Sequence, residues 1–128
     1  MFVRRVMEDI LDDGIDNSEH ILDMQKQVEM LIENISDNTD SAFDILKLHD
    51  DDKDQDLVDV YRIICNDILD CEKLAKQKVT LFQKGVQALE SSADAVKKLQ
   101  EFENLFDEIN RLEKSSDDLL KSLINKLS

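Results

Sequence analysis

The chain has 128 residues, of which 36 % are charged and 41 % hydrophobic, and its formal net charge is −14. This charge disfavours nucleic acid and anionic membrane surfaces as partners, because both are bound through Lys and Arg. There is no proline, and Gly14 and Gly85 are the only two glycines, so little in the composition interrupts long helices. The composition predicts a single all-α domain over residues 1–128.

Apolar residues in the first third of the chain are spaced three and four apart, the pattern of a helix that packs against another helix. The frame begins at Val3, Met7 and Ile10 and resumes beyond Gly14. Gly14 with the polar residues after it indicates either a kink or cap, or a continuous helix that tolerates one glycine. The later members of the frame are Ile21, Met24, Val28, Leu31 and Ile35.

Three polar segments are predicted to interrupt the helices, at 36–40, 49–55 and 90–93. Short polar side chains in the first segment compete for backbone hydrogen bonds, and the sequence from Ser41 to Asp44 then predicts a new helix start. The second segment is a run of aspartates. The third ends in Ser91-Ser92-Ala93-Asp94, which has capping-box spacing. A further turn is predicted at 115–118.

No segment alternates with a period of two for long enough to form a strand. The sequence therefore predicts an antiparallel bundle of three to four long helices with coiled-coil-like packing, and three if residues 36–40 only bend the first helix. The segment 9–12 (Asp-Ile-Leu-Asp) recurs at 67–70. Either a duplicated helical hairpin, about 1–52 and 53–128, or a shared heptad phase with biased composition explains this repeat.

The cysteines and the N-terminus indicate a cytoplasmic protein. Cys65 and Cys71 point about 120° apart on a helix, so they cannot bridge within it. Without histidines nearby they do not form a zinc motif. Glu8 and Asp9 interrupt the N-terminal apolar residues, which excludes a signal peptide, and no stretch approaches the ~18 apolar residues of a membrane span.

The chain lacks the motifs of an enzyme or of a cofactor site. There is no glycine-rich phosphate loop and no Glu-x-x-His pair for a di-iron site. Carboxylates spaced four apart do share a helix face, and two facing pairs of them would suit a hard cation. The candidate metal ligands are Glu8, Asp9, Asp12 and Asp13; the other interpretation of these residues is a solvated acidic surface.

The C-terminal stretch is apolar on more than one helix face, which a single buried stripe does not need. We therefore expect it to anchor an amphipathic helix of a partner protein, or else to close the end of the bundle. The predicted function is a non-catalytic interaction module: an adaptor, a small chaperone or a subunit of a helical complex. The alternatives are a cation- or ligand-responsive regulatory bundle and a purely structural coiled coil that self-associates, for example as a homodimer. The candidate anchors are Leu119, Leu120, Leu123, Ile124 and Leu127.

Overall fold

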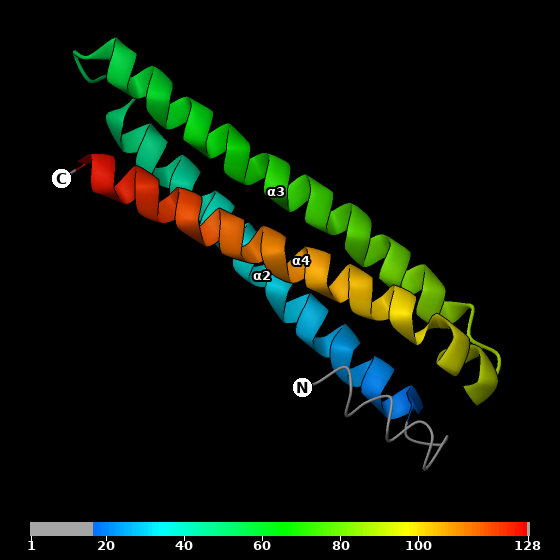
Figure 1. Ribbon diagram of the computed structural model, residues 1–128. Coiled ribbons are helices and arrows are strands. Elements are labelled where there is room, and N and C mark those ends of the chain that lie inside the picture. The colour runs from blue at the N-terminus through cyan, green and yellow to red at the C-terminus, as the bar shows by residue number, and fades with distance from the viewer. Residues whose placement is uncertain (1–16, 128) are drawn as a thin grey trace.

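The computed structural model describes residues 17–127, which form three helices: α2 (Asn17–His49), α3 (Gln55–Gln87) and α4 (Ser92–Leu127). Each helix packs against the other two. α3 runs antiparallel to α2 and α4, so the C-terminus lies at the same end of the bundle as the α2–α3 connection (Figure 1). The all-helical prediction is confirmed for these residues. The proposed duplication also involves residues 1–16, which lie outside the described range, and it stays a prediction.

The interruptions predicted at 49–55 and 90–93 are confirmed, and capping side chains explain where the next helix begins. At the start of α3, the Asp54 carboxylate accepts a hydrogen bond from the Leu57 backbone N–H at 3.2 Å. At the start of α4, the Asp94 N–H donates to the Ser91 hydroxyl oxygen at 3.4 Å. Each cap satisfies a backbone donor that has no partner within its helix.

The interruption predicted at 36–40 is wrong, because α2 continues through it to His49. The Thr39 hydroxyl donates to the Ile35 carbonyl at 3.1 Å within the same helix. The Asn38 side chain hydrogen-bonds to α4 and so does not compete for its own backbone. The turn predicted at 115–118 is also wrong, since α4 runs through it and the Ser116 hydroxyl donates to the Glu113 carbonyl at 2.7 Å.

The core consists of two hydrophobic clusters, one towards each end of the bundle. The first surrounds Phe82 and Phe102, whose ring centroids lie 5.0 Å apart. Gly85 permits this contact, because a Cβ atom there would lie 2.6 Å from Phe102 Cε1. The second cluster lies at the end with the α2–α3 connection. Its buried members are Ala42, Tyr61, Ile64, Cys65, Ile68 and Leu123.

A layer of buried polar residues separates the two clusters. Along each helix one such residue comes between the members of the first cluster and those of the second: Thr39 on α2, Glu72 on α3 and Ser116 on α4. Ser116 occupies the same heptad position as the buried Ile109 and Leu123. We call these three residues the central polar layer. It forms the middle of a core that is otherwise mainly apolar.

Candidate functional site

The five predicted C-terminal anchors are distributed between the core and the surface. Leu123 is fully buried in the second cluster, and Leu119, Leu120 and Leu127 are half-buried against it. Ile124 alone is exposed, with 48 % of its surface accessible. Four of the five leucine and isoleucine side chains thus pack within the bundle end.

The predicted metal ligands Glu8, Asp9, Asp12 and Asp13 lie outside the described residues. Within residues 17–127, no group of three or more His, Cys, Asp or Glu side chains is arranged to hold a metal ion. The same range contains no helix long and apolar enough to cross a membrane.

The two cysteines are free thiols on α3. Cys65 is buried, and its Sγ donates to the Ala42 carbonyl at 3.3 Å. Burial raises the pKa of Cys65. Burial, together with the charges of Asp67 and Asp70, raises the pKa of Cys71. Both thiols are therefore protonated at neutral pH, which makes them poor nucleophiles and poor metal ligands.

Polar side chains from α2 and α4 form a hydrogen-bond network beside the central polar layer. The Asn38 Nδ2 group donates to Ser116 Oγ at 3.0 Å and to Asp117 Oδ1 at 2.5 Å. A hydrogen bond with Asp117 raises the pKa of the Glu113 carboxyl, and burial and the Asp117 charge raise it further. Because these groups bond to each other across the bundle, they set the register of α2 against α4.

Glu103 is a buried carboxyl group that the sequence does not single out. Its side chain is 2 % exposed, and its Oε1 atom has no hydrogen-bond partner. Burial raises the pKa of Glu103, the Asp107 charge adds to this, and His20 lowers it. The unpaired oxygen carries a desolvation cost that no hydrogen bond to it offsets. A charged residue on an amphipathic helix is normally read as exposed, so the pattern contains no signal for this burial.

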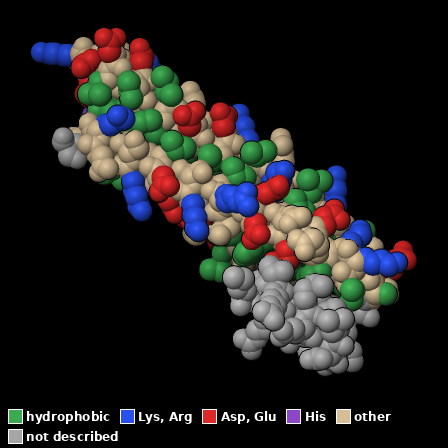
Figure 2. Space-filling model, in the orientation of Figure 1, with side chains coloured by type: hydrophobic (Ala, Val, Ile, Leu, Met, Phe, Trp, Pro, Cys, Tyr) green, Lys and Arg blue, Asp and Glu red, His purple; other side chains and the backbone are tan. Residues whose placement is uncertain are grey.

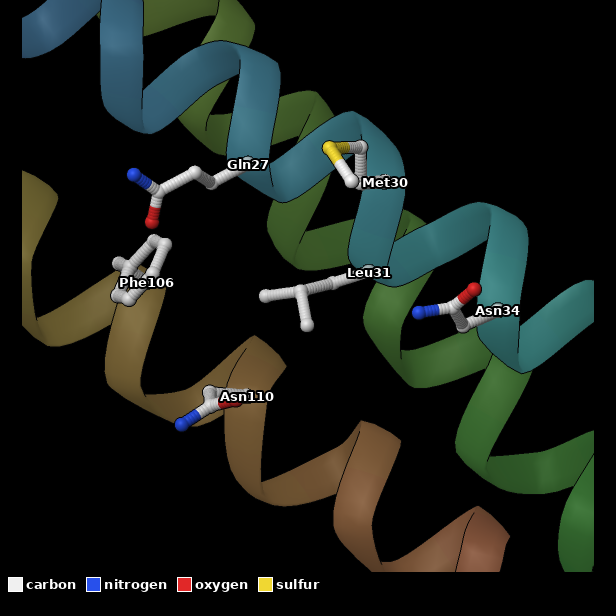
Figure 3. Close-up of a pocket in the computed structure, with 6 residues that line it drawn as sticks. All are labelled: Gln27, Met30, Leu31, Asn34, Phe106 and Asn110. Atoms are coloured by element: carbon white, nitrogen blue, oxygen red, sulfur yellow. The ribbon is translucent and has the colours of Figure 1, made fainter.

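A shallow groove lies between α2 and α4 (Figure 3). It has a volume of about 230 Å³ and is lined by side chains without charge. Leu31 extends from α2 towards α4, where Phe106 and Asn110 lie on the facing helix. The lining combines three apolar and three amide side chains, which suits a peptide surface better than a small charged ligand. The residues are Gln27, Met30, Leu31, Asn34, Phe106 and Asn110.

A second groove of about 300 Å³ lies between α3 and α4 and has a different character. Leu74 on α3 and Leu112 on α4 supply its apolar surface. Lys78 Nζ lies 3.1 Å from Glu108 Oε2, so an ion pair joins the two helices there. Arg111 also lines this groove. An apolar floor with charged edges is typical of surfaces that receive an amphipathic helix.

Exposed apolar side chains continue along α3 beside this groove. Val60 is 37 % exposed, Ile63 60 %, Leu74 44 % and Leu81 54 %. Successive members lie 3, 11 and 7 residues apart, which places all four on one side of the helix. We call these four residues the α3 stripe. Figure 2 views the side on which α3 and α4 lie in front of α2, and hydrophobic side chains appear there among the charged ones.

The α3 stripe is the functional candidate that the sequence interpretation missed. The buried face of α3 follows its own spacing through Val58, Tyr61, Cys65 and Ile68. The stripe residues are among the exposed apolar positions that remain after this face is removed, as is Leu57 near the start of the helix. The stripe can be recognised in the sequence only once the buried face is known, because the buried residues and the stripe residues each have a helical period.

Residues 17–127 therefore define an all-helical bundle with a polar layer inside it and an apolar stripe along one helix. Comparison of the chain with protein-family models, with curated proteins and with solved structures gave no match. The proposals that follow rest on the geometry described above.

Proposed function

We propose that the protein is a non-catalytic interaction module that binds an amphipathic helix of a partner protein along the α3 stripe and the adjoining α3–α4 groove. The observation that carries this proposal is the stripe itself: four half-exposed aliphatic side chains on one helix face. A partner helix with anchors at i, i+3 or i+4 and i+7 matches that spacing. An adaptor, a small chaperone and a subunit of a helical complex all use such a surface.

The size of the stripe limits the affinity. Completing the burial of four aliphatic side chains that are already half covered contributes roughly 1 kcal/mol each, or about 4 kcal/mol in total. Association costs at least that much. Useful affinity therefore requires further contacts in the α3–α4 groove, where Leu112 adds apolar area and Arg111 is available to a carboxylate. The proposal thus covers both the stripe and the groove.

The two free thiols support a non-catalytic role in the cytoplasm, which is part of this proposal. Both thiols are unpaired and have raised pKa values, so they are neither disulfide partners nor activated nucleophiles. We also propose that the helices pack against each other as in a coiled coil. The buried residues Phe102, Ile109 and Leu123 of α4, which recur at heptad spacing, support this.

The test is capture by the tagged full chain from the soluble lysate of its source cell. The stripe variant Ile63→Asp/Leu74→Asp is compared with the control variant Leu22→Asp/Leu48→Asp, which places the same two charges at exposed positions of α2. We expect one near-stoichiometric helical protein that the wild type and the control retain and the stripe variant loses. Equal capture by all three proteins contradicts the proposal.

A further inference from the structure

We propose that the α3 stripe also pairs with the α3 stripe of a second copy of this chain, with the two helices antiparallel about a twofold axis. The inference rests on the proposed function, because it names a partner for the same surface. It is carried by a second property of α3, the distribution of its charges.

The charges of α3 are divided between its two halves. Residues 55–70 carry four aspartates and one arginine, a net charge of −3. Residues 71–87 carry four lysines and one glutamate, a net charge of +3. The aspartates are Asp56, Asp59, Asp67 and Asp70, and the lysines are Lys73, Lys76, Lys78 and Lys84.

This polarity selects the orientation of a pair. Antiparallel helices place the acidic half of each copy against the basic half of the other, so both contacts are attractive. Parallel helices place like charges together. An antiparallel pair is also isologous, which closes the assembly at two copies.

The apolar residues and the charges have neighbouring centres. The ends of the stripe, Val60 and Leu81, are equally distant from the point between Asp70 and Cys71, and the charge changes sign two residues further on, between Glu72 and Lys73. A pair centred there brings Val60 of one copy near Leu81 of the other while opposite charges face each other. This register brings the apolar ends of the two stripes together and places the acidic half of each helix beside the basic half of the other.

The expected interface is small. The stripe spans 22 residues, which is about 32 Å of helix, and two helices in contact over that length cover roughly 600 Å² per copy. This lies below the ~800 Å² per partner of stable complexes, so we expect a dissociation constant in the micromolar range. The net charge of −14 opposes association, but at physiological ionic strength its effect is screened beyond about 8 Å. The facing charges of the two α3 helices act within that distance.

The first experiment is sedimentation velocity of the full chain from about 5 to about 500 µM, a range that brackets weak affinities of this class. We expect the wild type and the control Leu22→Asp/Leu48→Asp to reach the mass of two chains. We expect Ile63→Asp/Leu74→Asp to keep the mass of one chain, with unchanged helix content by circular dichroism. All four substituted positions are exposed, so the variants retain the core.

The second experiment tests by charge reversal whether the charges of α3 hold the pair together. In Asp67→Lys/Asp70→Lys both halves of α3 are positive, and in Lys73→Glu/Lys84→Glu both are negative. Each variant alone is expected to stay a single chain. An equimolar mixture is expected to form a heterodimer, because each half then faces an opposite charge. In the described part of the chain these four side chains take part in no ion pair.

The outcomes separate this inference from the proposed function. A wild type that keeps the mass of one chain overturns the pairing, while helix binding is judged by the capture experiment. A dimer that persists in Ile63→Asp/Leu74→Asp overturns the stripe as the contact. A mixture of the charge variants that does not associate, although the wild type does, overturns the pairing of opposite charges between the two α3 helices.

Discussion

The Asn38 amide of α2 donates a hydrogen bond to the Ser116 hydroxyl of α4 over 3.0 Å, joining residues 78 positions apart in the sequence. The Ser116 hydroxyl in turn donates a hydrogen bond to the Glu113 carbonyl at 2.7 Å. Apolar clusters lie on both sides of this contact. Apolar side chains tolerate sliding of one helix along another, whereas a hydrogen bond of fixed geometry does not. The contact therefore specifies one alignment of α2 and α4.

Asn38→Ala is expected to lower the free energy of unfolding by about 1–2 kcal/mol, because it leaves Ser116 and Asp117 without their partner. Urea denaturation measures this change, with Asn66→Ala at an exposed position of α3 as the control. In a double-mutant cycle with Ser116→Ala, the two effects are expected to be less than additive. Additive effects would contradict a direct contact.

Glu103→Met is expected to stabilise the protein by about 1–3 kcal/mol at neutral pH, because it removes a buried oxygen that has no partner. Glu101→Met, exposed on the same helix, removes the same charge and is the control. A destabilised Glu103→Met variant would show that the carboxyl group makes a favourable contact.

The same carboxyl group predicts a pH dependence of stability. The pKa of Glu103 is raised in the folded chain, chiefly by burial, so the folded state binds this proton more tightly than the unfolded state. Its contribution is fully present below the unfolded pKa of about 4.3 and is lost as the pH rises through the folded pKa. Denaturation of the wild type and of Glu103→Met across this window measures it. Parallel curves for the two proteins would contradict the assignment.

Gly85→Ala is expected to destabilise the bundle by about 1–2 kcal/mol, although alanine normally favours a helix interior over glycine. The new Cβ atom would lie 2.6 Å from Phe102 Cε1 and 3.2 Å from Cζ, which forces the ring out of its contact with Phe82. Thermal unfolding measures the loss. In a Phe102→Leu background the same substitution is expected to be neutral or stabilising. A stabilising effect in the wild-type background would show that the ring moves at little cost.

Leu123→Asp and Ile124→Asp are expected to differ sharply despite being neighbours. Leu123 is fully buried, so a charge there is expected to cost more than about 4 kcal/mol and to unfold that end of the bundle. Ile124 is about half exposed, and its substitution is expected to change stability by less than about 0.5 kcal/mol. Guanidinium denaturation compares the two. Ile124→Asp is consequently the variant suited to testing partner binding by the C-terminal stretch.

The class of the fold and the two connections between the described helices follow from the sequence alone. A chain without proline, with apolar residues three and four apart, has no stable alternative to amphipathic helices. The aspartate run before Leu57 and the Ser91–Asp94 box end and begin helices because capping depends on neighbouring residues only. These features are local, so the sequence is sufficient to predict them.

The tertiary structure decided the features that depend on a second helix. Asn38 and Thr39 are residue types that commonly interrupt helices, yet α2 continues through them. The reason is that the Asn38 amide donates hydrogen bonds to Ser116 and Asp117 of α4. Leu123 and Ile124 are equivalent in the sequence, but one is buried and the other exposed. Glutamate normally lies on the surface, but the Glu103 side chain is buried. In each case the deciding energy comes from contacts between residues distant in the chain, and no local pattern records which residues will meet.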